Sequence, residues 1–222
     1  MANLNRLNPG TLLNGFGGAL RIAATVLLSP LLQTWYQKWG THGNESVRIL
    51  PGDELINQAR SRITCGITIE DGADAVFPWL VQIGCQRAGW YSYDLLDNGG
   101  EKSAESILPE HQQLAVGDPV YATPDGKLSF PVVQVIPGKA LVLGGTVDTK
   151  TGKGNPTRTE DMHSFFSGVM VFYLEEQAEQ LTRLFFRQRL DWNPGFLNFL
   201  AYRVFLEPLS FVMVRKTLKT LK

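Results

Sequence analysis

Hydrophobic and polar positions alternate along residues 62–70, where Ile63, Cys65, Ile67 and Ile69 are separated by polar or small residues. An apolar repeat of two predicts a half-buried β-strand. Cys65 falls on the apolar side of this strand, which is typical of a small core side chain. Further apolar runs, bounded by turn residues, predict four more strands at 131–137, 139–145, 164–174 and 181–190. Their spacing and turns favour an antiparallel meander.

Residues 88–96, AGWYSYDLL, are rich in aromatic side chains and end in a glycine turn, which predicts an extended segment. Successive side chains of a strand point to opposite faces. One face of this segment would therefore carry Trp90, Ser92 and Asp94, and the other Tyr91 and Tyr93. Side chains that combine a large apolar area with a polar tip suit both a packed core and the wall of a ligand cavity.

Helical patterns follow the first strand and close the chain. Residues 73–84 repeat apolar side chains at helical spacing, and a second short helix is expected around 104–114. Asn193 followed by Pro194 is a typical helix start, with a cap and then the first helical position. We therefore expect a long C-terminal helix over 193–219.

The N-terminal part of the chain is strongly apolar, and residues 18–39 read GALRIAATVLLSPLLQTWYQKW. A membrane-spanning helix needs about 20 consecutive apolar residues, and the uncharged run here is barely half as long. Trp35, Tyr36 and Trp39 cluster beside Lys38, as anchors at a membrane interface do. We expect an extra N-terminal helix that lies on a surface.

Charge is balanced overall but not along the chain. Lysine plus arginine and aspartate plus glutamate each total 21, so the net charge is zero and no nucleic-acid partner is expected. Residues 1–44 hold three basic and no acidic residues, and residues 183–222 hold eight basic and two acidic ones. Because both ends are basic and apolar, we expect residues 18–39 and the C-terminal helix to contact a membrane surface or a membrane protein. The pattern divides the chain into an apolar helical extension, 1–44, and a domain over 45–222.

Composition narrows the chemistry further. The 44% of hydrophobic residues excludes a disordered chain, and two cysteines with three scattered histidines predict neither a disulfide scaffold nor a metal site. No cofactor motif is complete, since Leu20 stands where a G-x-G-x-x-G pattern from Gly15 needs its last glycine, and no P-loop or G-x-S-x-G elbow occurs. The N-terminus lacks a typical signal peptide, so we expect a cytoplasmic protein with free thiols, peripheral on a membrane if its ends bind one.

Several blocks of sequence resemble a known family. They are LPGDEL at 50–55, ITIEDGADAVFPWLVQIG at 67–84, GWYSYD at 89–94, ILPEHQQLAVGD at 107–118 and EPLSFVMVRKTLK at 207–219. On these blocks the chain, over about residues 40–222, resembles the START-like SRPBCC superfamily, in particular its polyketide cyclase/dehydrase-like bacterial branch. The resemblance implies an α+β helix-grip fold, in which a curved antiparallel β-sheet wraps around a long C-terminal helix and two short helices follow the first strand. It also implies a mainly apolar cavity between sheet and helix, and it implies a fold more than a reaction.

The candidate ligand-binding residues gather around the aromatic block: Trp79, Arg87, Trp90, Tyr91, Tyr93, Asp94 and His163. In an apolar cavity, the Asp94 carboxyl would have a raised pKa and could act as an acid or base. The alternative is an ion pair between Asp94 and Arg87 or an arginine of 183–189. His163 has either a structural role or a role in proton transfer. No catalytic residue is assigned.

Arg183, Arg187 and Arg189 fall on one face of the last predicted strand. They form a solvated outer surface or, if they face the cavity, a site for an anionic group.

We expect a module that binds or carries an apolar small molecule, such as a lipid, an isoprenoid or an aromatic compound. Two alternatives stay open. One is a cyclase or dehydratase that uses Asp94 or His163 as acid or base, with Tyr91 or Tyr93 steadying an enolate. The other is a structural or assembly protein that docks through its apolar, basic ends. The absence of a motif that pairs an acid with a base favours the carrier.

Overall fold

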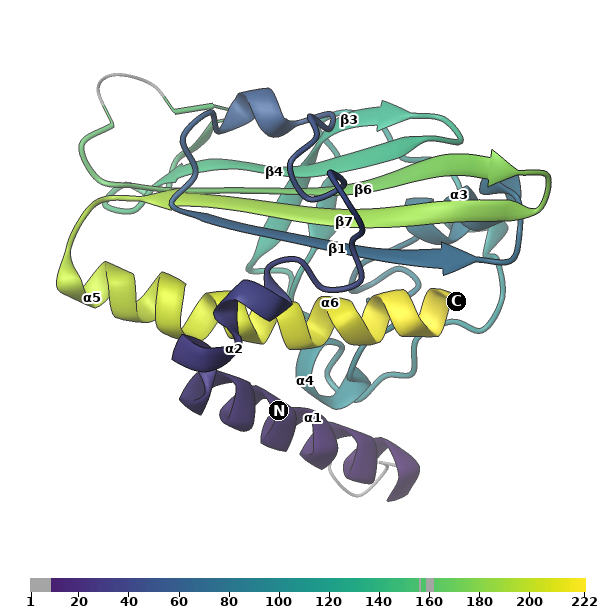
Figure 1. Ribbon diagram of the computed structural model, residues 1–222, viewed down its shortest axis with the longest axis horizontal. Helices are drawn as coiled ribbons and strands as arrows, with labels where there is room; N and C mark the ends of the chain where they lie inside the picture. The colour runs from purple at the N-terminus through teal and green to yellow at the C-terminus, as the bar shows by residue number, and fades with distance from the viewer. Residues whose placement is uncertain (1–8, 156, 159–161) are drawn as a thin grey trace.

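One antiparallel sheet of seven strands forms the centre of the computed structural model, which describes residues 9–155, 157–158 and 162–222 (Figure 1). The strands follow the order β1-β7-β6-β4-β3-β2, and β5 pairs with β4 beside this path. Every pairing is antiparallel, as the meander predicts. The strands are β1 (Ser61–Ile69), β2 (Pro119–Tyr121), β3 (Ser129–Ile136), β4 (Ala140–Asp148), β5 (Gly154–Asn155), β6 (Phe165–Ala178) and β7 (Leu181–Trp192).

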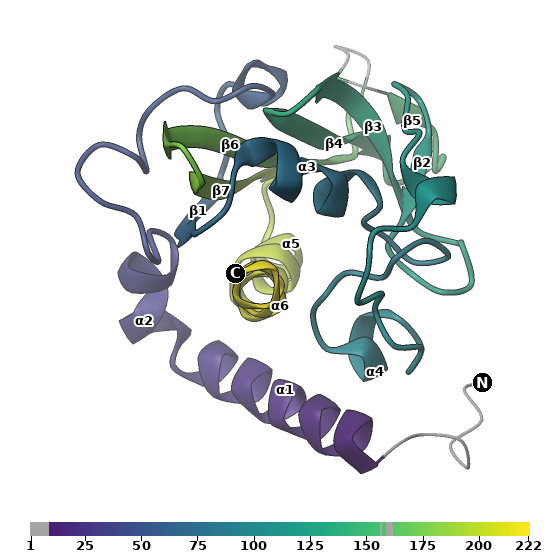
Figure 2. The same cartoon turned by 90° about the vertical axis from the view of Figure 1, so that its right-hand side faces the viewer.

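A long C-terminal helix lies in the concave side of the sheet, where Figure 2 shows it nearly end-on. It comprises α5 (Phe196–Asn198), a π-helical stretch η4 (Phe199–Leu206) and α6 (Glu207–Leu221). Phe211, Val212 and Leu218 are buried against the core. A curved sheet that encloses a C-terminal helix in this strand order is a helix-grip fold, which confirms the predicted fold class.

The helix begins at Phe196, and the predicted start at Asn193 is wrong. The Asn193 side chain is occupied elsewhere, since its amide donates to the His163 carbonyl at 2.6 Å and its oxygen accepts from the Phe165 N–H. The N-cap is Gly195, which makes no side-chain capping bond. Asn193 therefore ties the start of β6 to the end of β7 and leaves the helix uncapped by a side chain.

Two short α-helices, α3 (Ala73–Val81) and α4 (Asp94–Asp97), follow β1. One 3₁₀ turn, η2 (Asp53–Leu55), precedes β1, and another, η3 (Pro109–His111), follows α4. The strand predicted at 88–96 is wrong, because the chain turns there and then forms α4. Gly89 and Tyr91 have φ values of 80° and 55°, and this left-handed backbone cannot continue a strand. The helix predicted around 104–114 is reduced to the single turn η3.

The N-terminal segment forms α1 (Pro9–Leu27) and α2 (Ser29–Tyr36), which meet at 104°. α2, with eight residues, is too short to cross a membrane, and α1 alone does not have the hydropathy of a span, although the bent pair and the helix 196–221 both have the length and hydropathy of one. Gly15 and Gly18 are the buried residues of α1. A Cβ on Gly18 would lie 2.7 Å from the Tyr93 ring, so this glycine allows α1 to pack closely on the segment before α4.

The face of β7 that carries Arg183, Arg187 and Arg189 is not directed at the C-terminal helix. Arg183 and Arg187 are buried, so both predicted roles are wrong for them, whereas Arg189 is 12% exposed at the edge of the covered area. Segment 40–60 covers this face, and Arg187 is 1% exposed. Its guanidinium donates to Thr64 Oγ1, to the Asp53 carboxylate at 2.5 Å, and to the carbonyls of Arg48, Glu45 and Ser46. Burial lowers the pKa of Arg187, and the Asp53 carboxylate opposes that effect. These arginines fix the segment before β1 to the sheet.

Cys65 is buried in the core as its position in the strand predicts, and both cysteines are free thiols. Burial raises the pKa of both, that of Cys85 to about 11. Each is protonated at neutral pH, and neither behaves as a reactive thiolate.

Candidate functional site

A cavity of about 310 Å³ lies between the concave face of the sheet and the C-terminal helix. Most of its wall is apolar, which suits a ligand that leaves water for a hydrocarbon environment. Five polar side chains interrupt the wall: Ser92, Asp97, Gln188, Ser210 and Thr217. The apolar lining comes from the segment before α4, the loop between β2 and β3, the strands β3, β6 and β7, and the C-terminal helix. Its residues are Trp90, Ala122, Leu128, Phe130, Phe166, Gly168, Met170, Phe172, Phe186, Leu190, Leu206, Leu209, Met213 and Val214.

The floor of the cavity is built by cross-strand pairs of β6 and β7. Phe172 faces Phe186, Met170 faces Gln188, and Gly168 faces Leu190. These residues are every second one along each strand, so they share the concave face while the intervening residues face the other way. The period-two pattern of the sequence therefore determines which side chains a ligand would meet.

Three of the polar side chains already have partners within the protein. Ser92 Oγ donates to the Met213 carbonyl at 3.1 Å, Thr217 Oγ1 donates to the Trp90 carbonyl at 2.8 Å, and Ser210 Oγ accepts from Gln188 Nε2 at 3.4 Å. The first two bonds join the C-terminal helix to the aromatic block. The Ser92 and Thr217 hydroxyls therefore hold the helix in place, and their protons are already donated within the protein.

Asp97 and Gln188 contribute the acceptors that have no partner. Both carboxyl oxygens of Asp97 and Oε1 of Gln188 are buried without a well-formed hydrogen bond from a described residue, although the Ser92 hydroxyl and the Tyr93 N–H lie close enough to Asp97 to lower its pKa. A buried acceptor without a donor costs about 1–3 kcal/mol, so a bound molecule that supplies donors would recover that energy. The arrangement favours a ligand with hydroxyl or amide N–H groups.

The Asp97 carboxyl is also the titratable group of the cavity wall. Burial raises its pKa from 3.8 to about 7, and the nearby Asp94 carboxylate adds to the rise. Near neutral pH, Asp97 therefore exists in both forms. The neutral form can donate a hydrogen bond and the charged form can accept a proton, which are the properties of an acid–base group.

Trp90 is the predicted site residue that lines the cavity. Its indole Nε1 donates to the Tyr121 carbonyl at 3.1 Å, and its ring meets Phe130 edge-on at 6.1 Å. These contacts hold the indole as part of the wall between the cavity and β2. Its role in binding a ligand stays a prediction.

The other aromatic candidates pack outside the cavity. Tyr91 is 2% exposed and contacts Trp79 edge-on at 5.9 Å, while Gln82 Nε2 donates to its hydroxyl at 2.8 Å. Burial raises the pKa of Tyr91 to about 12. Tyr93 is buried against Gly18 of α1. Because the chain is not extended here, the two-faced arrangement expected from the sequence does not form.

The charged candidates are also placed elsewhere. Asp94 accepts hydrogen bonds from the N–H and hydroxyl of Ser103, at 3.1 and 2.6 Å, so the predicted ion pair with Arg87 or a β7 arginine is wrong. Arg87 instead donates to the carbonyls of Val81 and His111. His163 is exposed in the loop before β6. Neither Asp94 nor His163 is part of the cavity wall.

Sequence reasoning missed Asp97, Gln188 and the helix residues of the wall. Gln188 follows Arg187 in β7, so their side chains point to opposite faces of the sheet and Gln188 lies on the concave face. The alternation of the sequence therefore contains a signal for Gln188. Asp97 had no such signal, because it depends on the turn that forms α4.

Within the described residues, no group of three His, Cys, Asp or Glu side chains could hold a metal ion. The fold and the cavity together define a helix-grip protein with an internal, mainly apolar pocket.

No protein-family model and no curated protein matches the sequence. Similar solved structures include ginseng major latex-like protein 151 from Panax ginseng, at 14% identity over 73% of this chain and 98% of that chain, with a TM-score of 0.38. A START superfamily protein from Mycobacterium smegmatis is 7% identical over 71% of this chain and 94% of that chain, with a TM-score of 0.30. Scores this low carry no functional argument, and the fold assignment rests on the strand order and closing helix of this chain.

Proposed function

We propose that this protein binds a compact, mainly apolar small molecule that donates hydrogen bonds, and that it acts as a carrier or sensor of that molecule. The observation that carries the proposal is the cavity of about 310 Å³ with apolar walls and unpartnered acceptors on Asp97 and Gln188. Apolar burial contributes about 25 cal/mol per Å² of ligand surface, before ordering costs. A hydroxyl or amide N–H directed at the two acceptors would set the ligand's orientation.

The chemistry of the wall favours binding over catalysis. A cyclase or dehydratase that uses Asp94 or His163 would need those groups at the ligand, and neither lines the cavity. If the cavity catalysed a reaction, the acid–base group would be Asp97, which is the titratable residue of the wall. Catalysis would also need a second proton-transfer group, and the other polar lining side chains are hydroxyls and an amide.

The test uses a neutral apolar fluorescent probe, N-phenyl-1-naphthylamine, titrated into the full-length protein. Ser210→Phe on α6 adds a ring to the cavity wall, whereas Thr220→Phe adds one to an exposed position of the same helix. We expect wild type and Thr220→Phe to bind the probe and Ser210→Phe to lose at least about tenfold in affinity, since a filled cavity cannot accept the ring.

Native mass spectrometry of the purified protein complements the titration by detecting any small molecule that remains bound. Equal probe binding by wild type and Ser210→Phe, with both folded, would remove the cavity as the binding site. Trp90→Ala is a second variant, expected to weaken binding by about 1–3 kcal/mol because it removes a wall ring.

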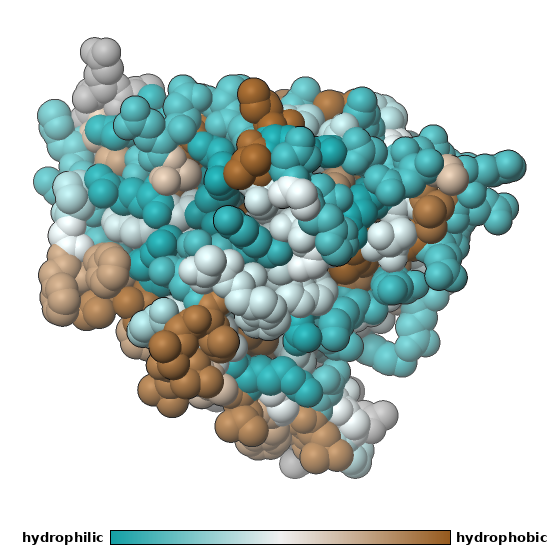
Figure 3. Space-filling model, in the orientation of Figure 1, coloured by the Kyte–Doolittle hydropathy of each residue, from teal (hydrophilic) through white to brown (hydrophobic). Residues whose placement is uncertain are grey.

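We also propose that the protein docks on the surface of an anionic membrane, because one side of the molecule exposes large apolar side chains. In Figure 3 brown surface gathers over α5 and over the α1–α2 pair. The exposed residues are Leu13, Phe16, Leu20, Leu27, Leu28, Leu31, Trp35, Phe196, Leu197, Phe199, Phe205 and Leu209. We call this set the apolar face. A surface of this size marks an interaction site rather than ordinary solvent exposure.

The charges around the apolar face favour a bilayer as its partner. α1 and α2 contain no acidic residue, and the groove between α1 and α6 is lined by Arg21, Arg215, Lys216 and Lys219. Basic side chains next to exposed leucine, phenylalanine and tryptophan suit an interface with anionic headgroups.

Flotation of the full-length protein with phosphatidylserine-containing liposomes tests this second proposal. Leu27 and Leu31 are 80% and 82% exposed, so the double variant Leu27→Ser/Leu31→Ser should fold and should float less. Val116, 69% exposed in the loop before β2, provides the control Val116→Ser. Wild type that stays at the bottom of the gradient, or a double variant that floats equally well, would show that the apolar face does not bind membranes.

A further inference from the structure

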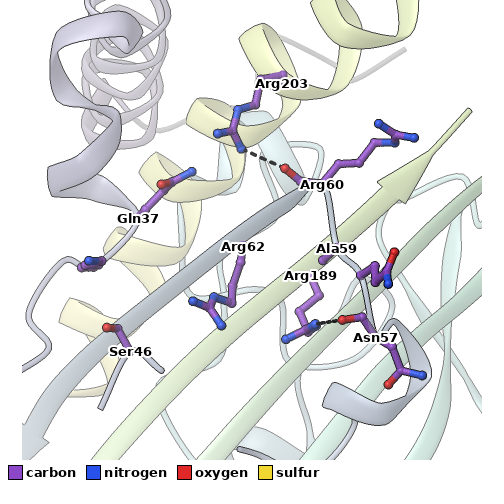
Figure 4. Close-up of a pocket in the computed structure, with 10 residues that line it drawn as sticks. Gln37, Ser46, Asn57, Ala59, Arg60, Arg62, Arg189 and Arg203 are labelled. Atoms are coloured by element: carbon purple, nitrogen blue, oxygen red, sulfur yellow. Dashed lines mark hydrogen bonds between the residues drawn. The ribbon is translucent and has the colours of Figure 1, made fainter. Parts of the chain in front are cut away.

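A second hollow, of about 400 Å³, lies at the β1 edge of the sheet, away from the cavity. Figure 4 shows its wall, in which side chains from β1 and β7 meet residues of the helix and of the segment before β1. The lining residues are Gln37, Lys38, Ser46, Asn57, Gln58, Ala59, Arg60, Arg62, Arg189 and Arg203. We call this hollow the basic pocket.

The basic pocket is lined by hydrogen-bond donors. Five of its side chains are cationic, four carry an amide or hydroxyl, and none is a carboxylate. Walls of this kind repel cations and attract oxyanions, and a guanidinium binds a phosphate through two parallel hydrogen bonds.

Part of this charge is compensated from outside the wall. Arg60 pairs with Asp191 at 3.1 Å, and Arg203 pairs with Glu207 at 2.7 Å. Arg189 lies 3.4 Å from Asp53 and also donates to the carbonyls of Ile56 and Asn57. The Asp53 carboxylate is shared, because Arg187 binds it at 2.5 Å.

Lys38 and Arg62 form no ion pair with any described residue. In addition, Arg62 lies directly opposite Arg189 in the β1–β7 pairing. Like charges at directly opposed positions of neighbouring strands destabilise a sheet. An anion between the two guanidinium groups would remove that repulsion.

We propose that the basic pocket binds a phosphate-type oxyanion, with Arg62 as its main ligand, Arg189 contributing charge from the opposite strand, and Lys38 and Arg203 at its rim. The anion has two possible sources, a free phosphate compound or the headgroup of an anionic lipid. The second source has a structural reason, since Arg203 belongs to the helical stretch that also carries the exposed Phe199 and Phe205. The proposal does not depend on the cavity, which lies on the opposite face of β7.

The test is a calorimetric titration of the full-length protein with inorganic phosphate at neutral pH and low salt. Arg62 is exposed and unpaired, so Arg62→Gln should fold normally. We expect its affinity for phosphate to fall about tenfold or more, because one charge-assisted contact is lost. Lys127→Gln, at an exposed site in the turn between β2 and β3, is the matched control and should bind like wild type.

A charge reversal provides a second variant. Arg62→Glu would place a carboxylate opposite Arg189, so we expect it to melt at a higher temperature than wild type and to bind no phosphate.

Vesicles of phosphatidylcholine with and without phosphatidic acid distinguish the two sources. Arg62-dependent binding to phosphatidic acid, without binding of free phosphate, assigns the pocket to a headgroup, and the reverse result assigns it to a soluble phosphate compound. If neither inorganic phosphate nor phosphatidic acid binds in an Arg62-dependent way, the proposal is wrong.

Discussion

The hydroxyl of Tyr36, at the end of α2, donates a 3.0 Å hydrogen bond to Oε1 of Glu207, the first residue of α6. Glu207 is fully buried, and four further side chains donate to its carboxylate: Gln33, Gln37, Ser61 and Arg203. One carboxylate thus joins α2, the first residue of β1 and the C-terminal helix. Burial raises the pKa of Tyr36 to about 12, so the phenol stays protonated and remains a donor.

Replacing Glu207 by glutamine should strongly destabilise the fold. Glu207→Gln removes the charge that pairs with Arg203 and leaves buried donors without an acceptor, so we expect the free energy of unfolding to fall by about 3–5 kcal/mol. Tyr36→Phe removes one bond to a charged group and should cost about 1.5–3 kcal/mol. Urea denaturation measures both values. Glu176→Gln, at an exposed position of β6, is the control and should behave like wild type.

The raised pKa of Asp97 predicts that stability falls as pH rises. The folded protein holds the Asp97 proton up to about pH 7, whereas an ordinary aspartate loses it near 3.8, so folding takes up a proton between these values. Stability from this group is therefore highest at low pH and is lost as pH rises through that window.

Asp97→Asn should remove the part of the pH dependence of stability that comes from the Asp97 carboxyl. We expect the variant to melt above wild type at about pH 8 and to show a smaller difference at about pH 4, with roughly 2–4 °C for each kcal/mol. Asp94→Asn is the control at the neighbouring carboxylate. It should destabilise slightly, because it removes the charge that strengthens the hydrogen bonds from Ser103. Melting curves of both variants across this pH range give the comparison. An Asp97→Asn variant that is less stable than wild type at high pH would contradict the assignment.

Sequence patterns predict the sheet well because one face of its strands is consistently apolar and packs against the C-terminal helix. The alternation along β1, β6 and β7 marks that face directly, and the chain order of strands and closing helix then defines the helix-grip fold. The aromatic block at 88–96 leads to a wrong prediction of a strand, since tyrosine and tryptophan have high strand propensity. Left-handed backbone at Gly89 and Tyr91 overrides that propensity and turns the chain into α4.

The turn at Gly89 and Tyr91 also limits how well the cavity residues can be predicted from the sequence. The aromatic pattern identifies Trp90 as a candidate. Asp97 lies in the cavity wall because α4 forms, and no local pattern distinguishes Asp97 from Asp94. The arginines of β7 were misassigned for a related reason. The period of two correctly placed Arg183 and Arg187 on one face, but the layer that covers this face comes from segment 40–60, and local patterns do not predict packing between segments so far apart in the chain.

Arg187 provides a test of that covering layer. Arg187→Met would leave the Asp53 carboxylate with the 3.4 Å contact to Arg189 and would remove the donors to three carbonyls of segment 40–60. We therefore expect a loss of about 3–5 kcal/mol in the free energy of unfolding. Arg62→Met, on the neighbouring strand but exposed and unpaired, should be as stable as wild type or more so. Chemical denaturation gives the free energy of unfolding of both variants for comparison with wild type. Equal stabilities would mean that Arg187 does not hold segment 40–60 on the sheet.

The packing of α1 can be tested with two glycines that are neighbours in sequence. A Cβ on Gly18 would lie 2.7 Å from the Tyr93 ring, whereas a Cβ on Gly17 would meet only the flexible end of Arg21, at 3.1 Å. In a helix, alanine is favoured over glycine by about 1 kcal/mol. Gly17→Ala should therefore raise stability by about that amount.

Gly18→Ala gains the same propensity, but it forces α1 away from a buried ring. Overpacking typically costs about 1–3 kcal/mol, so we expect Gly18→Ala to be less stable than Gly17→Ala and to show faster amide hydrogen exchange along α1. Thermal melts and exchange measured on both variants separate the two effects. If Gly18→Ala stabilises the protein as much as Gly17→Ala does, α1 is not held against Tyr93, and the outward orientation of its leucines would lose its structural basis.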